Sequence, residues 1–289
     1  MRASTVGGLA LLWIAAGIVC ARYDLLLSRT LVQPEADWAA FGQRFGELPG
    51  VYGLALAALA YQARSRPLRR PSWLVRELPW LLSSTTLAVA LALSSYRLFG
   101  HRLGALEATC LEAATLLGTR LWRRRLGLGV KLPWGWAQAS TWTLGLGLSI
   151  WLAVSLLKLV WGRVRYRDLT PWAEGFTPWY APQGWTGHAS FPSGHAALGW
   201  LLLPSLLIWP PGSTGYRWAF AISFGWGIFV AASRVVIGAH YLSDVLFSSA
   251  LAFGVMAFAP WRERDARTSR DSDVDQRAVD GRERLDDGK

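Results

Sequence analysis

Apolar runs near the length of a membrane-spanning helix recur from one end of this 289-residue chain to the other. The candidates are 5–21, 48–63, 79–99, 139–159, 196–211, 217–233 and 240–260. A transmembrane helix needs about 20 mostly apolar residues. An eighth candidate, 103–119, contains Glu107 and Glu112, and it either crosses the membrane or lies on its surface. The pattern predicts an all-α, polytopic transmembrane helical bundle of seven or eight spans.

The first run, 5–21, has two interpretations. Its short basic start and the small residues near Ala21 are also typical of a cleaved signal peptide. We favour an uncleaved first span, because the later runs already indicate a polytopic protein.

The composition agrees with a membrane protein. Hydrophobic residues make up 52% of the chain and charged residues only 17%, below the roughly 25% that is usual in soluble domains. The net charge of +11 comes from basic residues between the apolar runs, which indicates contact with anionic lipid rather than with nucleic acid. Cys20 and Cys110 lie in apolar stretches and predict neither a disulfide nor a zinc site.

Two Arg-rich loops predict the topology. Loop 64–78 has five arginines against one acid, and segment 120–138 has four arginines and one lysine with no acid. Short loops rich in Lys and Arg stay in the cytoplasm, so the chain should cross twice between these two loops. This requires 79–99 and 103–119 both to span. Loop 160–195 then lies on the extracytoplasmic face of the cell membrane, and both termini lie inside.

The chain is predicted to have three parts. Residues 1–78 form an N-terminal transmembrane extension, and 79–261 form the catalytic core. Residues 262–289 have eight basic and nine acidic residues and almost no apolar ones. Such a segment cannot bury enough surface to fold alone, so it is predicted to be a disordered cytoplasmic tail.

Three short patterns follow one another, and each sits at the end of an apolar run. They are "KLVWGRVR" (Lys158 to Arg165), "PSGH" (Pro192 to His195) and "SRVVIGAHYLSD" (Ser233 to Asp244). The topology above places all three on the extracytoplasmic face, where their side chains could form one site.

The patterns contain groups that suit a phosphate. Lys158, Arg165 and Arg234 supply three cations, and a guanidinium matches the spacing of phosphate oxygens. Ser193 and Gly194 precede a predicted helix, so their backbone N–H groups are expected to point at an anion. We therefore predict that these five residues bind phosphate.

The patterns also contain a candidate nucleophile and a candidate acid. His240 and Asp244 are four residues apart and are expected to share one helix face. Asp244 could then accept from one imidazole nitrogen and leave the other free as a nucleophile. His195 remains to act as the general acid on the leaving group.

Each feature alone has an ordinary explanation. Lys158 could be a snorkelling residue at the end of a span, and Arg234 could be a membrane anchor. Ser193 and Gly194 could form a simple turn, and His240 with Asp244 could be a structural pair. Taken together they favour a functional site, because ionisable groups within membrane segments are rare and usually functional.

In their order and spacing, Lys-x6-Arg, Pro-Ser-Gly-His and Ser-Arg-x5-His-x3-Asp resemble the type 2 phosphatidic acid phosphatase (PAP2) superfamily, which includes the vanadium haloperoxidases. The resemblance covers about 158–244. It departs at Tyr166, where the family usually has proline after the arginine. The family core is usually six helices, so one or two N-terminal spans here are additional.

The resemblance implies a mechanism without a metal or other cofactor. His240 would attack phosphorus and form a phosphohistidine, Asp244 would orient it, and His195 would protonate the leaving oxygen. The phosphate would be held by the residues that match the family pattern, namely Lys158, Arg165, Ser193, Gly194 and Arg234.

The favoured function is a membrane phosphatase whose partners are the bilayer and a lipid phosphate. Undecaprenyl diphosphate, phosphatidic acid and phosphatidylglycerol phosphate are the candidate substrates, and a polyprenyl diphosphate is preferred. A vanadate-dependent haloperoxidase is one alternative, although those relatives are soluble. A non-catalytic lipid-binding or transport protein is the other, although none of the chemical residues is missing.

Overall fold

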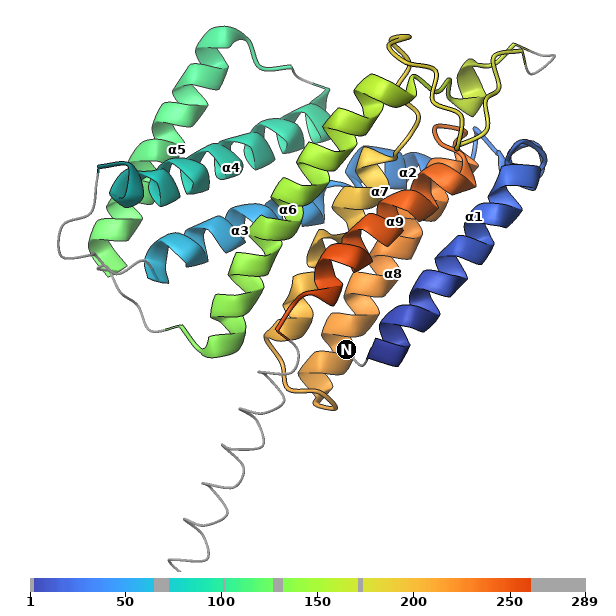
Figure 1. Cartoon of the computed structure of the whole chain (residues 1–289). Helices are drawn as coiled ribbons and strands as arrows, with labels where there is room; N and C mark the ends of the chain where they lie inside the picture. Colours follow the sequence, from blue (N-terminus) through green and yellow to red (C-terminus); the bar gives the residue numbers. More distant parts are fainter. Residues whose placement is uncertain (1–2, 65–72, 101, 127–131, 171–173, 261–289) are drawn as a thin grey trace, which may run out of the picture.

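The computed structural model describes residues 3–64, 73–100, 102–126, 132–170 and 174–260. Every regular element in these ranges is a helix, which confirms the all-α prediction (Figure 1). The elements are α1 (Ala3–Leu31), α2 (Asp37–Phe45), α3 (Leu48–Arg64), α4 (Trp73–Phe99), α5 (Ala105–Leu126), α6 (Trp134–Trp161), the 3-10 helix η1 (Tyr166–Asp168), α7 (Gly194–Gly199), the 3-10 helix η2 (Trp200–Leu207), α8 (Thr214–Val236) and α9 (Leu242–Ala257). The predicted tail, 262–289, lies outside the described residues.

Within the described residues, four helical stretches are long and apolar enough to cross a membrane: Ala10–Leu31, Trp80–Phe99, Trp134–Asp168 and Thr214–Val236. The chain is therefore a multi-pass membrane protein, as predicted. Gly194–Leu207 and Leu242–Ala257 are shorter apolar helices. The predicted total of seven or eight spans stays a prediction, because α3 has only 17 residues and α5 carries Glu107, Glu112 and several arginines.

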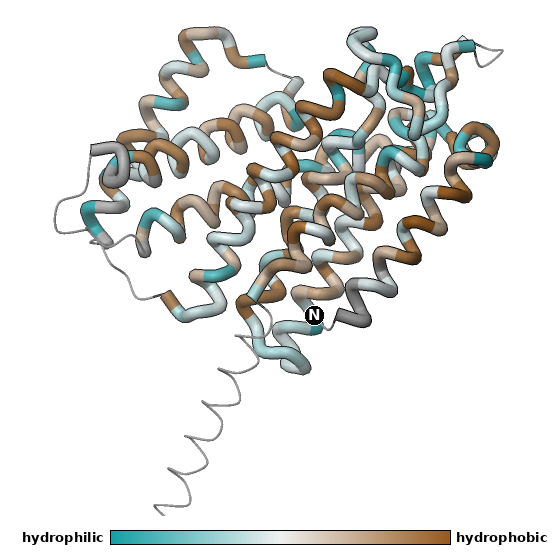
Figure 2. The backbone as a smooth tube through the Cα atoms, in the orientation of Figure 1, coloured by the Kyte–Doolittle hydropathy of each residue, from teal (hydrophilic) through white to brown (hydrophobic). Residues whose placement is uncertain are grey.

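The helices form a bundle with a lateral pair beside it (Figure 1). Helices α6, α7, η2, α8 and α9 pack together, and α1 packs along α9. Helix α3 packs between α6 and α4, and α4 in turn packs on α5. Figure 2 shows apolar residues along α1, where Leu11, Ile14 and Ile18 are exposed, as a lipid-facing surface requires.

Helix α1 is longer than the predicted first span. It continues ten residues beyond 5–21 and ends at Leu31. Half of the added stretch is polar, and one of these polar residues is Asp24, whose carboxylate is buried in the bundle. A helix can continue through a charged residue whose charge is paired inside the protein. The apolar pattern alone therefore predicted the end of this span too early.

The predicted span 196–211 is also different in the structure. It divides into the short helix α7 and the tighter 3-10 helix η2, which contains Pro204. Proline has no N–H group and its ring crowds the preceding turn, so a regular α-helix does not continue through it. The surrounding side chains Leu201, Leu203 and Leu207 are nevertheless buried in the main core.

The N-terminal helices approach the bundle closely at glycines. A Cβ atom on Gly42 of α2 would lie 2.4 Å from Ser233 Oγ in α8, and one on Gly50 of α3 would lie 2.2 Å from the Leu198 carbonyl oxygen. Only glycine allows such approaches. The approaches bring the α2–α3 turn against the ends of α7 and α8.

The described helix ends separate into two groups at opposite ends of the bundle. In Figure 1 the start of α1, the end of α9 and the start of α6 lie at the lower end of the bundle. The end of α6, the start of α7 and loop 174–190 lie at the upper end. Which end faces the cytoplasm stays a prediction from the basic loops.

Cysteine labelling would test that orientation. In a chain with Cys20→Ala and Cys110→Ala, Gly175→Cys should react with a membrane-impermeant thiol reagent added to intact cells. Ser72→Cys and Leu128→Cys should react only after the membrane is opened, because positively charged loops remain in the cytoplasm. The reverse pattern would place loop 160–195 inside and contradict the orientation.

Candidate functional site

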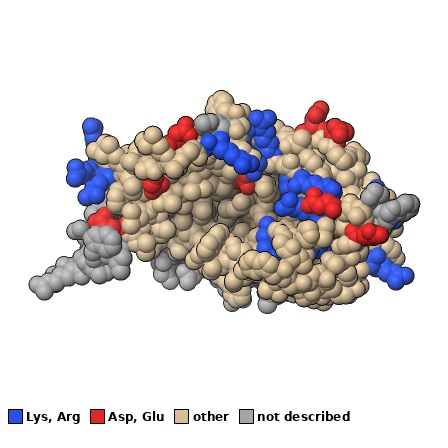
Figure 3. Space-filling model, turned by 90° about the horizontal axis from the view of Figure 1, so that it is seen from above, with Lys and Arg blue, Asp and Glu red and all other residues tan. Residues whose placement is uncertain are grey.

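The three sequence motifs meet at the upper end of the bundle. The backbone N–H of Ser193 donates to the Asp244 carbonyl oxygen at 3.3 Å, which joins the second motif to the third. A Cβ atom on Gly194 would lie 3.9 Å from Lys158 Nζ, which joins the second motif to the first. Figure 3, seen from above, shows Lys and Arg side chains gathered on this face of the molecule.

His240 is held in one orientation. Its Nδ1 lies 2.7 Å from the carbonyl oxygen of Ser190 and 3.5 Å from Asp244 Oδ2. A carbonyl can only accept, so Nδ1 carries the hydrogen and Nε2 of the neutral ring has a free lone pair. The sequence predicted Asp244 as the orienting group, whereas the shorter contact is made by a main-chain carbonyl.

The expectation that His240 and Asp244 share a helix face is wrong in detail. His240 lies in the α8–α9 loop, and α9 begins only at Leu242. Tyr241 is the extended N-cap residue, and its N–H donates to Asp244 Oδ2 at 3.0 Å. The turn brings His240 and the Asp244 carboxylate together although they are not on one helix.

Burial keeps His240 neutral. Its side chain is only 3% exposed, and loss of water lowers the pKa of the imidazole from 6.5 to about 4, although the nearby Asp244 acts in the opposite direction. At neutral pH the ring is therefore uncharged, which is the form that a nucleophile needs.

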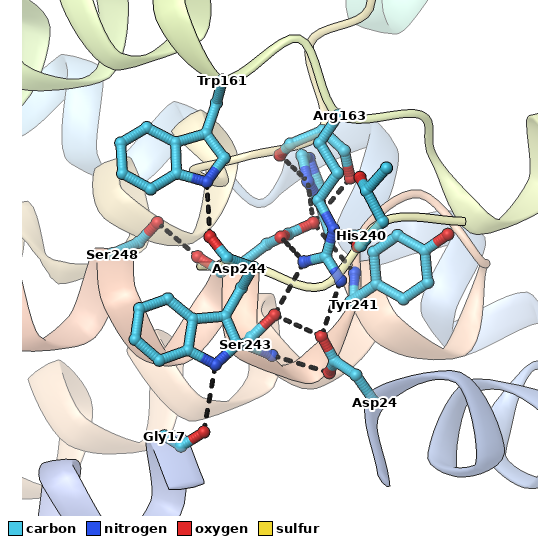
Figure 4. A network of polar contacts seen from close by, with 12 residues as sticks. Gly17, Asp24, Trp161, Arg163, His240, Tyr241, Ser243, Asp244 and Ser248 are labelled. Carbon is cyan, nitrogen blue, oxygen red and sulfur yellow. Dashed lines mark hydrogen bonds and ion pairs between the residues drawn. The ribbon is translucent and has the colours of Figure 1, made fainter. Parts of the chain in front are cut away.

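Asp244 has a full set of donors. Its Oδ1 accepts from Arg163 Nη1 at 2.6 Å, and its Oδ2 accepts from Ser190 Oγ at 2.6 Å (Figure 4). The carboxylate has no exposed surface. Ser190 thus binds Asp244 through its hydroxyl and His240 through its carbonyl, so one residue aligns both.

Arg163 connects Asp244 to the first helix. Besides Asp244, its Nη1 donates to Ser243 Oγ at 2.7 Å, and its Nη2 donates to Asp24 Oδ2 at 2.8 Å (Figure 4). Its guanidinium also lies 3.9 Å from the ring centre of Tyr241. The side chain is completely buried, so these groups replace all of its water.

Sequence reasoning missed this network. Arg163 lies inside the first motif, "KLVWGRVR", but only Lys158 and Arg165 were selected from it. Asp24 lies three residues beyond the predicted first span, 5–21, and it was not selected as a candidate, although an acid beside an apolar span is a signal for a buried partner. Ser190 lies just before the second motif, and nothing in the sequence distinguishes it.

The three predicted cations line the site. Arg234 is 4% exposed, and its Nη1 donates to Gln43 Oε1 at 3.1 Å. Among the described residues, the buried Nε atoms of Arg165 and Arg234 have no hydrogen-bond acceptor. Buried donors are rarely left without a partner, so these two atoms are suited to an anion that completes the site.

Ser193 caps α7. Its Oγ accepts from the N–H of Ala196 at 3.4 Å, while its own N–H is directed at Asp244. The next two residues, Gly194 and His195, begin α7 and have no acceptor within the helix for their N–H groups. The phosphate roles of Ser193 and Gly194 stay predictions, and the N–H of Gly194 is the better placed of the two.

Tyr166 takes the position of the usual proline without opening the loop. It begins η1, and its ring meets the ring of Tyr241 edge-on with centres 6.3 Å apart. The next N–H, that of Arg167, donates to the Gly238 carbonyl oxygen at 3.0 Å. These contacts connect the first motif to the third and hold this loop in place.

Two side chains that precede the three motifs in the sequence contact His195. Its Nε2 lies 3.3 Å from Glu47 Oε2 and 3.4 Å from Arg97 Nη2. Glu47 lies in the α2–α3 turn and Arg97 in the last turn of α4. The candidate acid is therefore in contact with both elements, and the sequence motifs gave no sign of either contact.

Comparison with known proteins agrees with the motifs. Residues 139–267 match the PAP2 superfamily, which confirms the predicted resemblance. The chain is similar to Phosphatidylglycerophosphatase B of Escherichia coli (strain K12) and of Shigella flexneri, each 35% identical over 89 residues. That alignment covers 29% of this chain and 34% of each relative, so the chain spans about a third of the length of these relatives. No solved structure matches it.

Histidine NMR in detergent would test the state of His240. With the pKa lowered to about 4, the ring should stay neutral and protonated at Nδ1 as the pH falls from 7 to 5. His240→Gln assigns the signal, and titration of His240 near pH 6.5 would contradict the buried, carbonyl-held ring.

Proposed function

We propose that this chain, of which residues 139–267 match the PAP2 superfamily, is a membrane phosphatase that cleaves phosphate from a lipid through a phosphohistidine. The observation that carries the proposal is the fixed ring of His240, with a neutral Nε2 beside three cationic side chains. The activity of the whole protein is part of the proposal, as the similarity to the phosphatases covers 29% of the chain.

In the first step, the lone pair of His240 Nε2 attacks phosphorus. The N–P bond forms and the bond from phosphorus to the lipid oxygen breaks. The imidazole becomes positively charged, and the buried carboxylate of Asp244, 3.5 Å from Nδ1, stabilises that charge. The Ser190 carbonyl keeps Nδ1 as the donor throughout, so the nucleophile does not change tautomer.

His195 supplies the proton for the leaving oxygen. An alkoxide is a poor leaving group, and transfer of a proton to it in the transition state typically accelerates such a reaction by about 10²–10⁴. The lipid leaves as an alcohol, or as a monophosphate if the substrate is a diphosphate.

Lys158, Arg165 and Arg234 stabilise the transferring phosphoryl group. Their charges offset the negative charge on its oxygens, and the unpartnered Nε atoms of Arg165 and Arg234 are available to donate to them. The N–H of Gly194, at the start of α7, adds a neutral donor.

In the second step, water attacks the phosphohistidine. His195, now neutral, takes a proton from the water, the O–P bond forms and the N–P bond breaks. The bonding pair returns to His240 Nε2, inorganic phosphate is released and both histidines regain their starting states.

Trapping of the intermediate would test the mechanism. His240→Ala should abolish turnover and remove any acid-labile phosphoenzyme, since no other residue then offers the attacking nitrogen. Asp244→Asn should leave a small residual rate, because the shape survives while the charge is lost. His188→Ala, which changes an exposed histidine in the same outer loop, should behave as wild type. Full activity in His240→Ala would contradict the mechanism.

The preferred substrate is a polyprenyl diphosphate such as undecaprenyl diphosphate. A fourth cation supports this choice, since Arg167 Nη1 and Arg234 Nη1 both donate to Gln43 Oε1, at 3.2 and 3.1 Å. Arg167 is half exposed beside the buried Arg234, where a second phosphate could be bound. The similarity to Phosphatidylglycerophosphatase B favours phosphatidylglycerol phosphate instead, and phosphatidic acid is the third candidate.

A substrate panel would separate these candidates. We expect kcat/KM in detergent to be highest for farnesyl diphosphate, lower for phosphatidylglycerol phosphate and phosphatidic acid, and lowest for 4-nitrophenyl phosphate, which has no lipid tail. Arg167→Gln should lower kcat/KM for the diphosphate more than for the two monoesters. If a glycerolipid is preferred by about tenfold or more, the polyprenyl assignment fails while the phosphatase remains.

A further inference from the structure

Glu47 has the geometry of an orienting carboxylate for His195. Its Oε2 lies 3.3 Å from His195 Nε2, and the Glu47 side chain is only 9% exposed. A carboxylate oxygen can only accept, so this contact needs a hydrogen on Nε2. Among the described residues, the other ring nitrogen, Nδ1, has no hydrogen-bond partner, and it is thus the nitrogen available to a leaving group.

Arg97 fixes the position of Glu47. Its Nε donates to Glu47 Oε1 at 2.9 Å, and its Nη2 donates to the same oxygen. This two-point contact occupies Oε1 and leaves Oε2 for His195. Arg97 Nη2 also lies 3.4 Å from His195 Nε2, and a guanidinium can only donate, so Arg97 faces Nε2 as an acceptor when the ring is neutral at Nε2 and Glu47 faces it when Nε2 carries a hydrogen.

We propose that Glu47 is a positioning residue that orients His195 and stabilises its protonated form, so that Nδ1–H can be donated to the leaving oxygen. The inference rests on the proposed function, in which His195 is the general acid. It assigns to the α2–α3 turn, outside the segment 139–267 that matches the superfamily, a part in the reaction.

The charges around His195 explain why such a carboxylate is needed. Positively charged side chains face it from α4 (Arg97), α6 (Lys158) and α8 (Arg234), and His240 faces it from the α8–α9 loop. Burial and these positive side chains lower the pKa of the His195 ring to about 2, and His240 adds to them once it has become cationic. Glu47 is negative and in direct contact, so it offsets them at the moment when the imidazolium must exist.

The proton transfer balances. In the reactive form, His195 is an imidazolium with Nε2–H facing Glu47 and Nδ1–H directed at the lipid oxygen. As the P–O bond breaks, the Nδ1 proton and the oxygen lone pair form the alcohol O–H, and the ring becomes neutral. Glu47 stays in contact with Nε2–H and carries no proton away. In the second step, Nδ1 takes the proton from water.

The test compares two substrates that differ in how much their leaving oxygen needs a proton. Dodecyl phosphate leaves as an alkoxide unless it is protonated, whereas 4-nitrophenyl phosphate leaves as a stabilised phenolate. For Glu47→Gln, kcat/KM for dodecyl phosphate should fall by about 10², the lower part of the range for general acid catalysis, and by no more than about threefold for 4-nitrophenyl phosphate. The limb of the pH profile that reports deprotonation of the acid should move to lower pH.

The ratio of the two kcat/KM values is the decisive quantity. Both values scale with the amount of folded protein, so their ratio does not depend on it. The ratio therefore remains valid if Glu47→Gln weakens the contact with Arg97 and lowers stability. Glu112→Gln is the matched control, because Glu112 of α5 accepts from the exposed Thr85 hydroxyl, at 3.2 Å, and its replacement should leave the ratio unchanged. Glu47→Asp, which keeps the charge, should restore part of the ratio.

Two outcomes would overturn the inference. If Glu47→Gln lowers kcat/KM equally for both substrates, or for neither, Glu47 only supports the structure. If the wild-type protein forms no phosphoenzyme and cleaves neither substrate, the proposed function itself fails, which is a different result. A selective loss on dodecyl phosphate together with the shifted pH limb supports the inference.

Discussion

A guanidinium held between two buried carboxylates is the interaction on which this site depends. Arg163 bonds to Asp244 on one side and to Asp24 on the other, and all three side chains are at most 1% exposed. Charges taken out of water are costly unless each one is paired and hydrogen-bonded, and removal of one partner of such a group typically costs about 3–5 kcal/mol. Two carboxylates for one guanidinium leave a net negative charge beside His240. That charge is what the histidine needs when it becomes cationic during attack.

This arrangement makes the N-terminal helices part of the site. Asp24 comes from α1, and Gln43 and Glu47 come from α2 and the turn that follows it, all within the segment 1–78 that was predicted as an extension. The proposed core boundary at residue 79 stays a prediction. The contacts nevertheless connect both sides of it, because His240, Arg234 and His195, the proposed nucleophile, phosphate-binding arginine and acid, are each supported, directly or through Arg163, by a side chain from before it.

The helices and the motif residues could be predicted from the sequence because their signals are local. Apolar runs predict helices, and the spacing of Lys158, Ser193 and His240 within known motifs predicts their chemistry. The supporting groups could not be predicted in the same way. Asp24 and Arg163 are 139 residues apart, and the contact to His240 that best fixes its tautomer is made by a main-chain carbonyl, which every residue has. The division of 196–211 at Pro204 and the short helix α2 likewise depend on packing against α8 and the core.

The two histidines differ in a way that suits their proposed tasks. The side chain of His240 is 3% exposed and that of His195 is 26% exposed. A nucleophile gains from a fixed direction, which burial and the Ser190 carbonyl provide. An acid has to meet an oxygen that belongs to the substrate, so it must be open on that side. In phosphoryl transfer the attacking and leaving atoms lie roughly in line across phosphorus. If His240 attacks from within the bundle, the lipid oxygen and the chain attached to it lie on the opposite side, next to His195 and the ends of α2 and α4. The N-terminal helices would then contact the substrate chain as well as the acid.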